Sequence, residues 1–211
     1  MKRIYLLVGL MFTLYLPAAA QDLSSDDLLG EIDEEMEETP LLPERMLFTQ
    51  RMLWGERGLY RGIGFAPKEL TAESREKELK ARRTMFRIHQ ATGFLAAGGM
   101  VAQAIIGPKL YNGNFQIRDL HEKVALGTNI AYGTTAVMAL TSPPPMVNRK
   151  KFDNIKLHKI LAVVHLSGIV ATNVLAHQAS EGNVNKNWHR AAAITTFGAY
   201  AAAIASIKFE F

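Results

Sequence analysis

Cysteine is absent from this chain of 211 residues. Its absence excludes disulfide bonds, thiolate-bound zinc, iron–sulfur clusters and c-type haem attachment. A metal site would therefore use histidine, methionine, tyrosine or carboxylate ligands. A large excess of one charge is also lacking, because 24 lysines and arginines nearly balance 20 aspartates and glutamates. The net charge of +4 is too small to indicate a nucleic-acid-binding protein, and no zinc-finger or RNA-recognition pattern is present.

Signatures of common enzyme classes are lacking as well. No glycine-rich phosphate loop follows a strand pattern, and Ser167-Gly168 lacks the context of a nucleophile elbow. The residues that are present are unevenly distributed: residues 22–88 are strongly charged, whereas residues 89–207 are mostly apolar. This division predicts a membrane domain preceded by a polar N-terminal region.

The N-terminus has the three parts of a secretory signal peptide. Lys2 and Arg3 form a basic start, residues 4–16 are apolar, and Pro17–Ala20 supply the small residues of a cleavage site. The apolar part is short for a membrane span. We therefore assign residues 1–20 to a signal peptide in preference to an uncleaved anchor helix.

The region between the signal peptide and the apolar half is expected to be polar. Residues 21–43 form an acidic, disordered linker, which is either a solvated spacer or a docking site for a basic partner. Residues 44–88 form an amphipathic and charged helical region. Its first part suits a helix lying in the membrane interface, or packed against the membrane domain or a partner. Its second part, residues 72–83, predicts a solvated helix that continues without a breaker to His89.

The second half of the chain has four apolar stretches, and each begins with a histidine: His89, His121, His158 and His189. The distance from one of these histidines to the next is the length of one helix and one short connection. About 18–20 mostly apolar residues follow each histidine, which is the length of a membrane-crossing helix. The spans that we assign are residues 89–107, 121–141, 158–177 and 189–207. The predicted fold is all-α: a transmembrane up-and-down four-helix bundle over residues 89–211.

Alternating helix directions would place His89 and His158 at one membrane face, and His121 and His189 at the other. Two facing imidazoles can ligate one haem, so the pattern favours two b-type haems, one near each surface. The alternative for each histidine is an interfacial hydrogen-bonding residue, but ionisable groups at membrane depth are usually functional. Two histidines leave the iron no open position, which suits an electron carrier rather than an oxygen binder.

Other residues near the histidines have more than one interpretation. The residues one turn beyond each histidine are small, as a porphyrin edge or ordinary helix packing would require. His165, about 10 Å deeper than His158, is a rival ligand, a propionate partner or a core histidine. His177 is a candidate for binding a propionate or a quinone-like substrate, or is interfacial. The cations beside the histidines either pair with propionates or snorkel to the headgroups: Arg87, Lys123, Lys159 and Arg190.

The layout resembles the four-helix core of the cytochrome b561 family, which also occurs linked to DOMON domains. The similarity covers residues 86–207 and rests on helix starts such as Ile88–Phe94, Leu157–Lys159 and Trp188–Arg190. In that family ligands pair between alternate core helices. The resemblance therefore implies two haems, one held by His89 with His158 and one by His121 with His189. Donor and acceptor stay open between a protein, a quinone and an ascorbate-like reductant.

The predicted function is a b-type di-haem membrane cytochrome, and thus a transmembrane oxidoreductase. The alternative is a haem-free anchor or accessory subunit of a larger complex, docked through residues 44–88. A proton relay ranks last, because only Gln103, Asn129 and Asn173 offer a polar path through the bundle.

The expected location is a bacterial inner membrane, with bilayer lipid as a partner and assembly as a homodimer or larger complex. The signal peptide places the N-terminal tail in the periplasm. The positive-inside rule opposes this orientation, because basic residues gather on the His89 side.

Overall fold

The computed structural model describes residues 40–146 and 152–208, and these residues form helices without any strand. The all-helical prediction is confirmed for this part of the chain. The predicted signal peptide and nearly all of the acidic linker lie outside the described residues.

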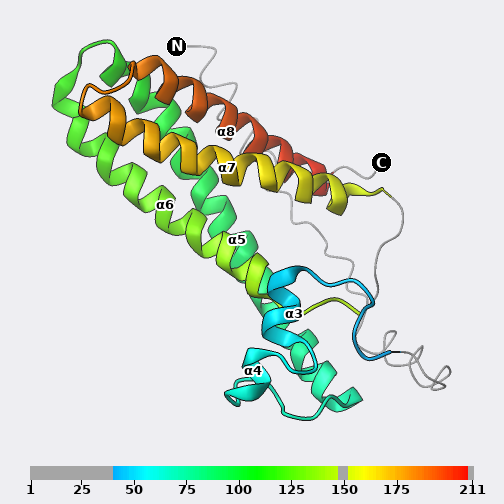
Figure 1. Ribbon diagram of the computed structural model, residues 1–211. Coiled ribbons are helices and arrows are strands. Elements are labelled where there is room, and N and C mark those ends of the chain that lie inside the picture. The colour runs from blue at the N-terminus through cyan, green and yellow to red at the C-terminus, as the bar shows by residue number, and fades with distance from the viewer. Residues whose placement is uncertain (1–39, 147–151, 209–211) are drawn as a thin grey trace.

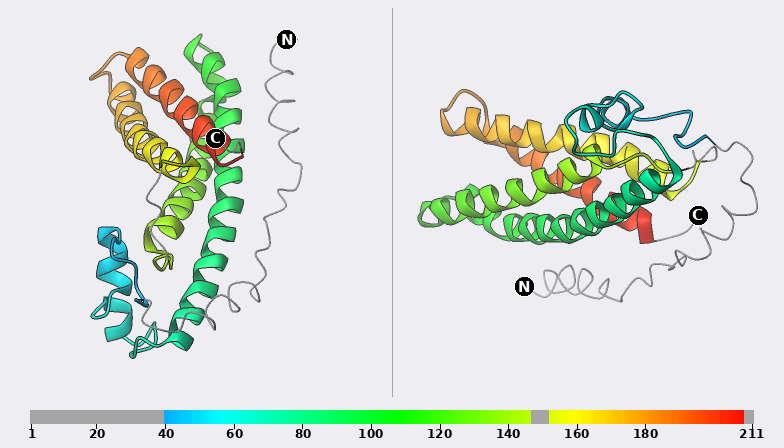
Figure 2. Two further views of the ribbon diagram at one scale, coloured as in Figure 1. Left: turned by 90° about the vertical axis from the view of Figure 1, so that its right-hand side faces the viewer. Right: turned by 90° about the horizontal axis from the view of Figure 1, so that it is seen from below.

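Four long helices form two helical hairpins (Figure 1). The first joins α5 (Ala72–Tyr111) to α6 (Arg118–Thr141) through the short 3₁₀ helix η2 (Phe115–Ile117). The second joins α7 (Asn154–Ser180) to α8 (Lys186–Lys208). Helices within a hairpin pack closely along their length, whereas the two hairpins meet mainly between α5 and α8. The tips of both hairpins lie at the same end of the molecule, as Figure 2 also shows.

Three helices are long and apolar enough to cross a membrane: α5, α7 and α8. α6 is the fourth predicted span, and it falls short of the same measure among the described residues. The physical reason is its composition, since it begins with charged residues and continues with Gly127, Thr128, Asn129 and Tyr132. That α6 crosses a membrane therefore stays a prediction.

A capping residue sets the start of the long helix α5, and a glycine turn follows its end. Thr71 caps its start by accepting a hydrogen bond from the Ser74 backbone at 3.1 Å. As predicted, it continues without a break past His89. The helix also passes through Pro108, the residue after the first assigned span of residues 89–107, and ends at Tyr111. Gly113, with a φ of 96°, then supplies the left-handed turn that leads to η2.

The two hairpins repeat one another in sequence and in packing. Gly99 and Gly168 stand at the same interval after the first histidine of each hairpin, and Thr128 and Thr196 stand at the same interval after the second. A Cβ atom at Gly99 would overlap the Thr128 hydroxyl, and one at Gly168 would overlap the Thr196 hydroxyl. Each hairpin therefore depends on the same glycine–threonine contact to bring its two helices together.

The helices α3 (Phe48–Trp54) and α4 (Leu59–Gly62) and the start of α5 form a small cap. It lies at the end of the molecule opposite the hairpin tips. It covers the end of α6, where helix termination leaves backbone carbonyls without helical partners. Four successive carbonyls there, from Thr141 to Pro144, each accept one cap side chain: Trp54 Nε1 at 2.7 Å, Gln50 Nε2 at 3.4 Å, Arg82 Nη1 at 2.6 Å and Arg75 Nη2 at 3.1 Å.

Buried charges hold this cap together. Glu78 pairs with Arg61 at 2.5 Å and with Arg75, and all three side chains are almost completely buried. The prediction of a solvated helix over residues 72–83 was wrong for Arg75 and Glu78, because their partners come from distant parts of the chain. Burial, and then the positive charge of Arg75, lower the pKa of the nearby Arg82 below its usual value.

Candidate functional site

The four histidines meet in two pairs, each joining one histidine from each hairpin. The ring centroids of His89 and His158 are 6.3 Å apart, and those of His121 and His189 are 6.4 Å apart. The ring planes are nearly perpendicular, at 76° and 80°. These are the two pairs that alternate-helix pairing predicts. Their role as ligands stays a prediction.

Backbone carbonyls fix three of the four imidazole rings. His89 Nδ1 lies 2.9 Å from Thr135 O, and His158 Nδ1 lies 2.9 Å from Ala203 O. His189 Nδ1 lies 3.0 Å from the carbonyl of Thr172. Because a carbonyl oxygen can only accept, each Nδ1 must carry the proton. The Nε2 atom of each ring is then unprotonated, which is the form that a metal ligand requires.

The spacing within each pair suits a metal ion between the rings. A metal–imidazole nitrogen bond is about 2.0 Å, and a ring centroid lies about 1 Å behind its nitrogen. Two imidazoles on opposite sides of one ion therefore have centroids about 6 Å apart. The observed 6.3 and 6.4 Å agree with this arrangement.

The number of ligands decides which kind of metal group fits. Among the described residues, no three histidine or carboxylate side chains converge on a point where they could hold a metal ion by themselves. A pair of histidines needs a metal whose other ligands come from elsewhere. A haem iron meets this condition, because the porphyrin supplies four nitrogens and the protein supplies the axial ligands. The residues present therefore fit a haem better than a bare ion.

The hydrogen bonds also give the distance between the two histidine layers. Each acceptor carbonyl belongs to a residue about four helical turns beyond the histidine that opens its own helix: Thr135 beyond His121, Ala203 beyond His189 and Thr172 beyond His158. At about 5.4 Å per turn, the layers are roughly 21 Å apart. This separation is smaller than the thickness of a hydrocarbon core, about 30 Å, so both layers would fit within one bilayer.

His165 lies two turns below His158, midway between the layers, and it belongs to an aromatic cluster. Its Nδ1 is 2.7 Å from the Tyr132 hydroxyl, and its ring lies 4.9 Å from the Tyr200 ring. The Tyr200 hydroxyl donates to the Gly93 carbonyl at 2.9 Å. Of the three predicted roles, these contacts favour a core histidine. The cluster links the hairpins across the centre of the membrane domain.

The other predicted site residues lie at the surface. The cations Arg87, Lys123, Lys159 and Arg190 are all exposed. Lys123 pairs with Asp119 at 2.7 Å, and Arg190 stacks over the Tyr111 ring at 4.8 Å. His177 is exposed as well, with its Nε2 3.3 Å from a Glu181 carboxylate oxygen. None of these contacts brings the four cations against a histidine ring.

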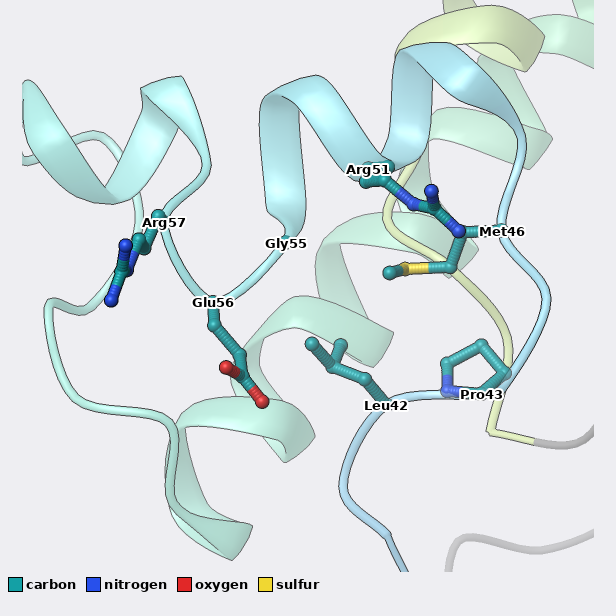
Figure 3. Close-up of a pocket in the computed structure, with 7 residues that line it drawn as sticks. All are labelled: Leu42, Pro43, Met46, Arg51, Gly55, Glu56 and Arg57. Carbon is teal, nitrogen blue, oxygen red and sulfur yellow. The ribbon is translucent and has the colours of Figure 1, made fainter.

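The described surface also has a shallow hollow in the cap, shown in Figure 3. The segment before α3, the end of α3 and the turn toward α4 line it, with Leu42 and Glu56 on facing sides. Its lining contains no histidine and lies apart from both histidine pairs.

Comparisons with protein-family models, with curated proteins and with solved structures found no match. The site is therefore interpreted from its own geometry.

The contacts of two groups near the histidines were not predicted from the sequence. Tyr132 and Tyr200 stand at the same interval after His121 and His189, on the histidine faces of their helices, but this spacing does not reveal that both contact His165. Gln103 was considered only as part of a proton path, yet its amide contacts the backbone of His121.

Proposed function

We propose that this protein is a b-type membrane cytochrome with two bis-histidine haems, which carries electrons between the two faces of a bilayer. The observation that supports this most is the pairing of four histidines in two layers, with three rings fixed in the ligand-competent tautomer. The sequence resemblance to the cytochrome b561 core agrees with it.

The protein's contribution is to hold and orient the ligands. His89 and His158 would hold one haem, and His121 and His189 the other. The haem iron supplies reversible one-electron chemistry when it is bound. The carbonyl acceptors of the imidazole Nδ1–H groups fix the ring orientation and raise the basicity of Nε2. The residues one turn beyond His121 and His189 are small, Ala125 and Ala193, and would add little bulk beside these rings.

The proposal includes α6 as a fourth membrane span, because it carries His121 and packs along α5. It also places the cap outside the cytoplasm of a bacterial cell, on the side where the proposed signal peptide would deliver the N-terminus. The donor and acceptor are then an external and a cytoplasmic redox partner, either proteins or small molecules such as quinols and ascorbate-like reductants.

Haem content tests this proposal. The purified protein, produced with haem supplied, should give a b-type reduced-minus-oxidised spectrum with two haems per chain by pyridine haemochrome. His89→Ala or His121→Ala should each leave one haem. His165→Leu is the matched control, because this buried histidine is not a proposed ligand, and it should keep two. Wild-type protein that is folded but binds no haem would refute the proposal.

A specific observation also favours the accessory-subunit alternative. The cap exposes large apolar side chains, among them Phe48 at 79%, Phe65 at 71% and Ile63 at 66%. Exposed apolar groups of this size suit a docking surface. Folded haem-free protein that co-purifies with a larger membrane complex would favour this second function.

A further inference from the structure

One of the four histidines differs from the others in its hydrogen bonding. His121 Nδ1 is buried and has no hydrogen-bond partner among the described residues. Its counterpart in the second hairpin, His189, uses the carbonyl of Thr172. Thr172 stands about four helical turns after His158, and the residue at the same interval after His89 in the first hairpin is Gln103. The repeat therefore puts Gln103 where an acceptor for His121 is expected.

The Gln103 side chain lies beside His121 and has an unused acceptor of its own. Its Nε2 donates to the His121 carbonyl at 2.7 Å. Its Oε1 is buried without a partner among the described residues. A buried ring nitrogen and a buried amide oxygen, on two residues already joined by a hydrogen bond, therefore both lack a partner among the described residues. Buried polar groups are destabilising when they are left unpaired, and a hydrogen bond between these two atoms would satisfy both.

We propose that Gln103 Oε1 accepts the Nδ1–H of His121 and is a positioning residue for this ligand. The inference rests on the proposed haem function and deepens it. Three ligands depend on main-chain carbonyls, which no substitution removes, whereas His121 depends on a side chain. The two haem sites are then chemically unequal, and the His121/His189 site is the one whose affinity and potential a single substitution can change.

The direction of the effect follows from the chemistry of the ligand. A hydrogen bond from Nδ1–H makes Nε2 more basic, and a more basic ligand favours ferric over ferrous iron. Loss of such an outer-shell partner lowers metal affinity by about 10–100-fold. If the affinity for oxidised haem falls tenfold and the affinity for reduced haem is unchanged, the midpoint potential of that haem rises by about 59 mV for one electron.

The experiment compares Gln103→Leu with Gln103→Glu and Thr128→Val in haem-loaded protein. Redox titration should show Gln103→Leu raising the potential of one haem, the one that His121→Ala removes, and weakening haemin binding there by about 10-fold or more. Gln103→Glu keeps an acceptor and should not raise the potential. Thr128→Val is the packing control, since this buried side chain has the shape of valine and its hydroxyl bonds the Val124 carbonyl of its own helix, and both potentials should stay as in the wild type.

A second measurement does not need haem. In ¹⁵N-histidine-labelled protein in detergent, ring nitrogen shifts report which nitrogen carries the proton. Wild-type His121 should carry it on Nδ1, and Gln103→Leu should shift His121, but not His189, toward the Nε2–H form. This result in protein that binds no haem would support the hydrogen bond while the proposed function fails.

Two outcomes would overturn the inference. In the first, Gln103→Leu leaves the His121 tautomer unchanged, which would mean that the Gln103 carbonyl serves His121 just as the Thr172 carbonyl serves His189. In the second, Thr128→Val moves a haem potential as far as Gln103→Leu does, which would show an effect of packing alone.

Discussion

At the scale of single residues, each of the two hairpins has a close contact of glycine against threonine. Thr128 donates to the Val124 carbonyl at 2.7 Å, and Thr196 donates to the Ala192 carbonyl at 2.7 Å. Both hydroxyls are thus satisfied within their own helices. The facing Gly99 and Gly168 have no side chain to obstruct this approach. Both positions provide close helix approach, and in the second hairpin the Thr196 hydroxyl also lies 3.2 Å from the Thr172 hydroxyl of the facing helix.

Alanine at either glycine should therefore destabilise the protein. Gly99→Ala or Gly168→Ala places a methyl group on a threonine hydroxyl, and such overpacking costs about 1–3 kcal/mol. Thermal unfolding in detergent should show a lowered Tm for both. Gly98→Ala is the control, because a Cβ there meets nothing within 4 Å, and better helix propensity should leave its Tm equal or higher. Equal Tm values for all three variants would contradict this interpretation of the contact.

Much of the residue-level site could be predicted from the sequence. Each histidine opens an apolar stretch, so alternating helix directions were enough to predict which rings meet. Of the three roles that share the position of His165, the sequence favours a core histidine. Its contact with Tyr132 supports that role but could not be predicted, because it joins residues 33 positions apart in different hairpins.

At the scale of elements, the cap is held by charges that a sequence pattern assigns to solvent. The carboxylate of Glu78 offsets two guanidinium groups, those of Arg61 and Arg75, in a site with almost no exposure. A mixed-charge helix normally keeps such residues in water, as Lys80 and Glu76 do on the same helix. The cap could not be predicted because Arg61 and the carbonyls after Thr141 are distant in sequence from Glu78.

Removing this carboxylate should open the cap and spare the hairpins. Glu78→Gln leaves two buried cations without a counter-charge, and breaking a buried pair costs about 3–5 kcal/mol. Limited proteolysis should then cleave within residues 44–71 faster than in the wild type. The control Glu76→Gln disrupts an exposed pair worth at most about 0.5 kcal/mol and should leave the cleavage rate unchanged. Equal resistance of Glu78→Gln and wild type would mean that the ion pairs do not hold the cap.

At the scale of the whole molecule, two similar hairpins each contribute one histidine to each layer. Neither hairpin alone contains a complete ligand pair, so both proposed sites depend on how the hairpins meet. The central contacts are polar and cross between hairpins: Tyr132 with His165, and Asn129 with Asn173 at 2.7 Å. The all-helical class and the long helix α5 were predicted from the apolar stretches and the lack of a helix breaker. The close backbone approach of α5 and α8 between the hairpins was not predicted. The apolar stretches resemble one another and do not specify which helices become neighbours.

Electron transfer across a sealed bilayer tests the central claim most directly. Haem-loaded protein is reconstituted into vesicles with ferricyanide inside, and a membrane-impermeant reductant is added outside. The account predicts reduction of the enclosed ferricyanide by the wild type and by His165→Leu. His89→Ala and His121→Ala should each abolish it, because each removes one of two layers roughly 21 Å apart. Transfer at the wild-type rate in both ligand variants, or no transfer by wild-type protein that carries two haems, would contradict it.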